Sequence, residues 1–118
     1  MAGLIPSDYD GAVPVDGYGP GFFRVAGTVH HGPVLVDGTG RKDWQGLEDL
    51  APLLALSGLV DVLFLGMGTE LRYPPKAMSA ALEAIGITIE PMTTPSAARS
   101  YNVTLSEGRR VACALLPV

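Results

Sequence analysis

Short apolar runs separated by glycine, proline and aspartate fill the first forty residues. The clearest are FFRVAG at 22–27, TVHHG at 28–32 and PVLVDG at 33–38. Turn-forming residues at such close spacing indicate short antiparallel strands joined by tight turns. We therefore expect a β-rich N-terminal part.

The hydrophobic pattern changes from residue 47 onward. LEDLAPLLALSG at 47–58 has apolar residues at helical spacing and ends with a glycine suited to a helix terminus. Pro52 is tolerated in the first turn of a helix, so this helix should begin near Glu48. The next run, LVDVLFL at 59–65, is apolar apart from Asp61, as is typical of a strand that is covered on both faces. We expect it to be the central strand.

The rest of the chain alternates predicted helices and strands. PPKAMSAALEAIG at 74–86 and TPSAARSYNVTL at 94–105 have apolar residues at helical spacing and proline near the start, and Thr94 is expected to cap the second of these helices. ITIEPM at 87–92 and RVACALLPV at 110–118 are predicted strands. This alternation predicts an α/β fold with helix–strand repeats in the C-terminal two thirds, and the N-terminal strands are expected to add at one side or edge.

Composition and charge narrow the class of protein. The 118 residues fit a single domain, 1–118, because they can build one hydrophobic core. The net charge is −4 and the eight Lys and Arg residues are scattered, which argues against nucleic-acid binding. The apolar stretch 50–68 is interrupted by Pro52, Asp61 and a Ser-Gly pair, so we interpret it as helix, turn and strand rather than as a membrane span.

The cysteine content and the N-terminus bear on location. Cys113 is the one cysteine, so an internal disulfide is excluded and a reducing compartment is favoured. Residues 1–11 lack the basic start and apolar stretch of a secretory signal. We expect a cytoplasmic protein in which residues 1–11 form a flexible N-terminus.

Three segments together resemble a known family. They are GYGPGFFRVAG at 17–27, LFLGMGTE at 63–70 and PMTTPSAARSYNVTLSEGRRVACALLP at 91–117. The chain is similar over nearly its whole length to the small α/β domain family that includes the mitochondrial respiratory complex I assembly factor 3 and the adipogenesis-associated domain-containing protein. Its motifs are a Gly-x-Gly-Thr after the central strand and a tail pattern read here as Met92, Thr94, Ala98, Asn102, Gly108 and Arg109.

The resemblance carries expectations about fold and role. It implies a three-layer α/β fold with a central mixed sheet. It implies no established reaction, and bacterial members of the family are largely uncharacterised. The mitochondrial member acts as an assembly factor for complex I with a protein partner, so the resemblance implies a protein-binding role.

Gly66 and Gly68 end the expected central strand, and ligands of open α/β sheets collect at the carboxyl ends of strands. A dinucleotide fingerprint needs a third glycine where Leu71 stands, and no lysine is placed as in a phosphate-binding P-loop. Two interpretations stay open. The glycines serve backbone geometry and close packing alone, or the loop from Gly66 to Glu70 contacts a small ligand or a partner through residues such as Thr69.

A second strand end, at Met92, opens the last predicted helix. Backbone N–H groups at Ser96 and Ala97 are expected to face the same cleft as the glycine loop, and Arg99 would complete a site for a small anionic ligand. The alternative is that Thr94 caps the helix, worth about 1 kcal/mol, and that Arg99 is solvated or paired with a carboxylate. The ligand-binding candidates are Gly66, Gly68, Thr69, Met92, Thr94, Arg99 and Asn102.

The sequence offers little support for catalysis or metal binding. His30 and His31 are adjacent in a predicted strand, so their side chains should point to opposite faces. Cys113 lies in an apolar strand with no basic neighbour on its own face, which indicates an inert buried thiol. No spacing of carboxylates singles out an acid–base pair. We expect no catalytic residue, no metal site and no cofactor.

Two functional hypotheses follow. The first is a non-enzymatic binding or assembly module that contacts a protein, in line with the resemblance, and associates peripherally with a respiratory or membrane complex. The second is a small-ligand or anion-binding protein, or a weak enzyme, that uses the cleft at the strand ends. The aromatic residues near the start belong either to the core, the commoner case, or to an exposed surface; they are Tyr18, Phe22, Phe23 and Trp44. The oligomeric state stays open.

Overall fold

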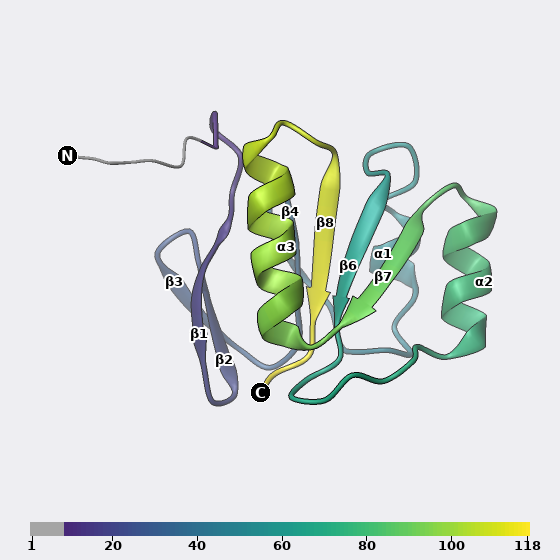
Figure 1. Cartoon of the computed structure of the whole chain (residues 1–118), viewed down its shortest axis with the longest axis horizontal. Coiled ribbons are helices and arrows are strands. Elements are labelled where there is room, and N and C mark those ends of the chain that lie inside the picture. The colour runs from purple at the N-terminus through teal and green to yellow at the C-terminus, as the bar shows by residue number, and fades with distance from the viewer. Residues whose placement is uncertain (1–8) are drawn as a thin grey trace.

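The computed structural model describes residues 9–118 and arranges them as eight strands and three helices (Figure 1). The expected flexible N-terminus, 1–11, lies largely outside the described residues. The elements in chain order are β1 (Val15–Gly19), β2 (Phe22–Val25), β3 (Thr28–His31), β4 (Val34–Asp37), β5 (Gly40–Asp43), α1 (Ala51–Leu54), β6 (Val62–Gly66), α2 (Lys76–Ala84), β7 (Thr88–Met92), α3 (Thr94–Ser106) and β8 (Val111–Leu115).

The central sheet has five strands in the order β5-β4-β8-β6-β7. β6 pairs in parallel with both β7 and β8, whereas β4 is antiparallel to β8 and to β5. The expected central mixed sheet is therefore confirmed. The run 59–65, predicted as the central strand, contributes β6, but β6 begins only at Val62, and β8 rather than β6 is the middle strand of the sheet. The last four residues of β6 are buried because helices cover both faces of the sheet (Figure 1).

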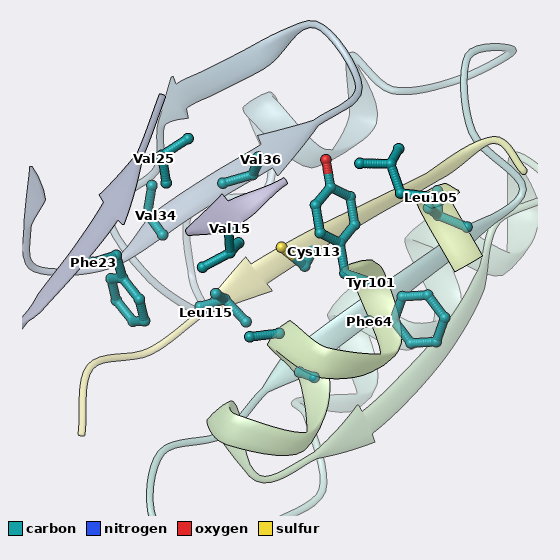
Figure 2. Packing of buried hydrophobic residues seen from close by; sticks show 13 residues of the cluster. Val15, Phe23, Val25, Val34, Val36, Phe64, Tyr101, Leu105, Cys113 and Leu115 are labelled. Atoms are coloured by element: carbon teal, nitrogen blue, oxygen red, sulfur yellow. The ribbon is translucent and has the colours of Figure 1, made fainter. Parts of the chain in front are cut away.

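Two layers cover the two faces of this sheet. On one face, α3 and a small antiparallel sheet of order β1-β2-β3 pack on β4 and β8 (Figure 2). On the other face, α1 and α2 pack on a second cluster of buried side chains. The cluster under α3 and the small sheet contains the buried side chains of Phe23, Val36, Tyr101 and Cys113. The cluster under α1 and α2 contains those of Leu53, Leu63, Met78 and Leu82.

The first helix is shorter than predicted. α1 begins at Ala51 rather than near Glu48 and ends at Leu54. Pro52 lacks an N–H and clashes with a helical carbonyl before it, so it must lie in the first turn. The residues before α1 instead form a turn in which Asp49 N donates to Gly46 O at 2.9 Å. The predicted boundary was wrong because this turn, rather than the helix, takes up residues 46–49.

Among residues 9–118, no helix has the length and hydrophobicity needed to cross a membrane.

Candidate functional site

The structure brings the two predicted strand ends together. Met67 N donates to Met92 O at 2.8 Å, and Thr94 N donates to Gly68 O at 2.9 Å. The end of β6 and the start of α3 are therefore joined by backbone hydrogen bonds. We call this region, made of Gly66, Gly68, Thr94 and Leu116, the strand-end junction.

Thr94 is the centre of the strand-end junction. Its side chain is fully buried, and its Oγ1 accepts a hydrogen bond from Gly68 N at 2.9 Å and donates one to Leu116 O at 2.7 Å. The expectation that Thr94 caps α3 is wrong, because Thr93 is the N-cap residue and the Thr94 hydroxyl is committed to these other partners. The hydroxyl ties β6, α3 and the end of β8 into one unit.

Gly66 allows this close approach. A Cβ at position 66 would lie 2.8 Å from Thr94 Oγ1, 2.9 Å from Thr94 Cα and 2.9 Å from Leu115 Cδ2. Gly68 has a φ of +96°, a conformation that side chains other than glycine rarely adopt. Close packing and backbone geometry thus account for both glycines.

The start of α3 is less open than expected. Ala97 N donates to Thr93 O at 2.9 Å, so the expectation of a free N–H at that residue is wrong. The Ser96 hydroxyl accepts from Thr93 Oγ1 at 3.1 Å, and Met92 Sδ accepts from the Ser100 hydroxyl at 3.6 Å. A ligand-binding role for this strand end stays a prediction.

Arg99 and Asn102 lie in a different place, a groove between β1 and α3. The groove has a volume of about 370 Å³. Asn102 clamps β1: its Nδ2 donates to Val15 O at 2.8 Å and its Oδ1 accepts from Val15 N at 2.9 Å. Arg99 is exposed on the helical wall. Further lining residues are Asp16, Tyr18, Pro95, Ala98 and Val103.

The Cys113 thiol is buried, and the His30 and His31 rings each lie beside nearby residues of the chain. Cys113 is fully buried, and burial raises the pKa of its thiol, which suppresses the reactive thiolate. His30 and His31 occupy opposite faces of β3, as predicted: His30 Nε2 lies 2.9 Å from Pro33 O, while the His31 ring lies 6.3 Å from that of Phe22. Within residues 9–118 no three His, Cys, Asp or Glu side chains cluster as metal ligands would.

A further exposed feature is the loop between β6 and α2. Thr69, the third candidate from the glycine motif, begins its exposed part, and Leu71 and Tyr73 follow with side-chain exposures of 59% and 86%. Sequence reasoning missed these two residues. The available signal was the pair Pro74 and Pro75, which together with Gly68 keeps the segment out of any helix or strand that would bury it.

The aromatic residues near the start of the chain do not share one exposed surface. Phe23 and Trp44 are buried, in separate clusters on opposite faces of the central sheet. Tyr18 is 45% exposed and lines the groove between β1 and α3. The core interpretation therefore holds for Phe23 and Trp44.

Comparison with known proteins identifies the family. Residues 15–116 match the model of a family described as "Protein of unknown function (DUF498/DUF598)". The chain belongs to this family. An uncharacterized protein of Rhodobacter capsulatus is 56% identical over 110 residues, which cover 93% of this chain and 89% of that protein.

The mitochondrial resemblance is also confirmed, at greater distance. NADH dehydrogenase [ubiquinone] 1 alpha subcomplex assembly factor 3 of Danio rerio is 29% identical over 85% of this chain, and that of Mus musculus is 25% identical over 97%. The chain spans 62% of the length of the zebrafish protein and 65% of that of the mouse protein.

Solved structures confirm the fold of the family. A Bartonella henselae protein described as an outer membrane protein has a TM-score of 0.83 at 34% identity, with coverage of 92% of this chain and 97% of that one. A Bordetella pertussis protein described as a Mth938-like domain has a TM-score of 0.77 at 25% identity, with coverage of 99% and 92%. The three-layer arrangement around a mixed sheet is thus shared with relatives.

Proposed function

We propose that this chain is a non-enzymatic protein-binding module that assists the assembly of a respiratory or other membrane complex. The observation that carries the proposal is the exposed pair Leu71 and Tyr73 on the loop after β6. Large apolar side chains this exposed are typical of contact surfaces, and aromatic residues are enriched at the centres of protein interfaces. The assembly factors among the relatives support the same class of role.

The free energy of hydrophobic burial favours contact between this loop and a protein partner over exposure of the loop to solvent. Complete burial of a leucine or an aromatic side chain contributes about 2 kcal/mol. Thr69, Glu70 and Arg72 are exposed beside the two apolar residues and supply polar groups for a rim. We place the module in the cytoplasm, peripheral to the complex that it serves.

The test compares two leucines that are equally exposed. Leu71 and Leu59 each have 59% of their surface exposed, but Leu59 lies in the turn after α1. In host cells that lack the native gene, a chain with Leu71→Ser and Tyr73→Ser should fail to restore the assembled NADH:quinone oxidoreductase, measured by native gel and membrane NADH oxidation. The Leu59→Ser chain should restore both. Equal restoration by the two variants would reject the proposal.

A second function, binding of a small anion, is favoured by one observation. Arg99 is exposed on the wall of the groove of about 370 Å³ between β1 and α3. Phosphate at ten times its Kd should stabilise the chain by about 1.4 kcal/mol, and Arg99→Gln should remove that shift. A melting temperature that phosphate leaves unchanged would exclude this function.

A further inference from the structure

The two sheets together have four outer strands, and three of them are protected against pairing with another chain. An outer strand presents unpaired N–H and C=O groups, so native proteins block it with charge, proline, bulges or covering elements. β5 carries three consecutive exposed charged residues, Arg41 to Asp43. β7 contains Pro91, which has no N–H to offer. Both ends of the central sheet are therefore blocked.

β1 is protected in another way. The Asn102 side chain occupies both backbone groups of Val15, α3 packs alongside, and the register of β1 shifts between Val15 and Gly17 as in a β-bulge. Bulges and covering helices are recognised means of closing a sheet edge. The β1 edge of the small sheet is thus largely covered by α3 and the Asn102 side chain.

β3 has none of these features in its own sequence, and the Arg41 guanidinium of β5, which lies beside it, bonds to the His30 ring rather than to the β3 backbone. Its sequence is Thr-Val-His-His, without proline, lysine, arginine or carboxylate, and its four pairs with β2 run in unbroken register. Figure 1 shows β3 at the outer margin of the molecule, on the far side of the small sheet from α3. β3 is therefore the least protected edge among the described strands.

The turn before β3 determines which backbone groups point outward. Ala26 and Gly27 form a two-residue loop with φ values of 52° and 76°, the signature of a type I′ hairpin turn. In such a turn the flanking residues, Val25 and Thr28, form a hydrogen-bonded pair. Non-hydrogen-bonded and hydrogen-bonded pairs then alternate along the two strands. The N–H and C=O groups of Val29 and His31 consequently point away from β2, toward an added strand.

Side chains on the outer face of the small sheet define what such a strand should carry. Val29 is 43% exposed and lies directly opposite Arg24, which is also exposed. Phe22 lies against Gly19, where a Cβ would sit 2.4 Å from the phenyl ring. Neighbouring strands lie about 4.8 Å apart, so a glutamate on an added strand can reach across Val29 to Arg24. The face suits one apolar and one acidic residue.

We propose that β3 is a docking edge for an extended segment of a partner protein, which pairs with Val29 and His31 and places valine-like and acidic residues beside Val29 and Arg24. The proposal rests on the protein-binding role proposed above and names a second surface for it. Main-chain pairing would supply affinity, and the side chains on alternate positions would supply specificity.

The test uses an acetylated and amidated peptide, Thr-Val-Thr-Glu-Thr-Val-Thr-Glu, added at millimolar concentration to the ¹⁵N-labelled full chain. The amides of Val29 and His31 should shift and become about tenfold more protected from hydrogen exchange, whereas the same peptide with proline at its centre should leave them unchanged. Val29→Pro removes an outward N–H and should weaken binding about tenfold.

Two further variants keep the test decisive. Arg24→Glu should weaken binding of the glutamate peptide about fivefold and leave the hairpin intact, which covers the case in which Val29→Pro does not fold. The chain with Leu71→Ser and Tyr73→Ser should bind the peptide like the native chain, although it is expected to fail in the assembly assay. If the loop variant restores assembly as well as the Leu59→Ser chain does, only the role of the loop is rejected, and the docking edge stands as an observed binding surface.

Three results would overturn the docking edge. The first is no amide shift on β3 at any peptide concentration. The second is a shift that maps to the groove between β1 and α3 instead. The third is sedimentation of the free chain as a dimer with Val29 and His31 already protected, which would show that a second copy occupies the edge.

Discussion

The strand-end junction and the loop that follows it are adjacent in sequence and opposite in character. At the junction, Gly66, Gly68 and Thr94 are buried and joined by hydrogen bonds. A few residues later, Leu71 and Tyr73 are exposed. The glycine motif thus builds a buried, hydrogen-bonded base, and the loop beyond it carries the contact surface that we propose. A family motif at a strand end can serve the fold, while the residues proposed for function lie just outside it.

The largest loss of stability should come from a side chain added at Gly66, in the strand-end junction. Gly66→Ala places a Cβ within 3 Å of backbone and side-chain atoms of Thr94 and should lower the free energy of unfolding by about 3 kcal/mol. Gly17→Ala is the control, because its added Cβ meets nothing within 4 Å. Urea unfolding measures both. Equal stability of the two variants would contradict the packing role of Gly66.

Removal of the Thr94 hydroxyl should have the next largest effect. Thr94→Val keeps the shape but leaves Gly68 N and Leu116 O without their partner, which should cost about 2 kcal/mol in urea unfolding. Thr94→Ser retains the hydroxyl and should lose less. If Thr94→Val were as stable as the native chain, the hydroxyl would not hold the junction together.

Loss of the clamp on β1 should be milder. Asn102→Ala removes two hydrogen bonds to Val15 and should lower the free energy of unfolding by about 1.5 kcal/mol. The amide of Val15 should exchange with solvent faster, whereas amides of β6 should keep their relative protection. Unchanged exchange at Val15 would show that α3 holds β1 by packing alone.

The smallest effect concerns an exposed ion pair. A hydrogen bond from Arg110 lowers the pKa of Asp61 below its ordinary value of 3.8. A lowered folded-state pKa stabilises the fold above the unfolded pKa, and this contribution is lost as the pH falls below 3.8. Asp61→Asn should therefore reduce the melting temperature slightly at neutral pH and not in acid. High salt should shrink the difference.

Hydrophobic periodicity was enough to predict β2, β3 and β4, the buried extended run that contains β6 and the α/β order, because these depend on local pattern and burial. β1 and β5 were not predicted, because their sequences, Val-Asp-Gly-Tyr-Gly and Gly-Arg-Lys-Asp, lack an apolar run. The start of α1 and the role of Thr94 were not predictable from such pattern. The role of Thr94 depends on contacts between distant segments, such as the bond from Thr94 Oγ1 to Leu116 O. The late start of α1 depends on the local turn that joins Asp49 N to Gly46 O. The exposure of Tyr73 likewise depends on what the rest of the fold leaves uncovered.

The candidate site divides in the same way. The sequence correctly predicted that the β6 end and the α3 start are neighbours, because carboxyl ends of parallel strands meet at one edge. It placed Arg99 in that same cleft and counted Asn102 among the ligand-binding candidates, but the structure puts both residues in the groove between α3 and β1. Helical rotation explains the difference: residues 99 and 102 lie on the side of α3 that faces β1.

The most direct test of the central claim measures stability and assembly for one variant. The chain with Leu71→Ser and Tyr73→Ser should unfold within about 0.5 kcal/mol of the native chain, because both side chains are exposed. At equal cellular levels it should nevertheless fail the assembly assay. Full restoration of assembly by this stable variant would contradict the claim that the chain works by contact through the loop.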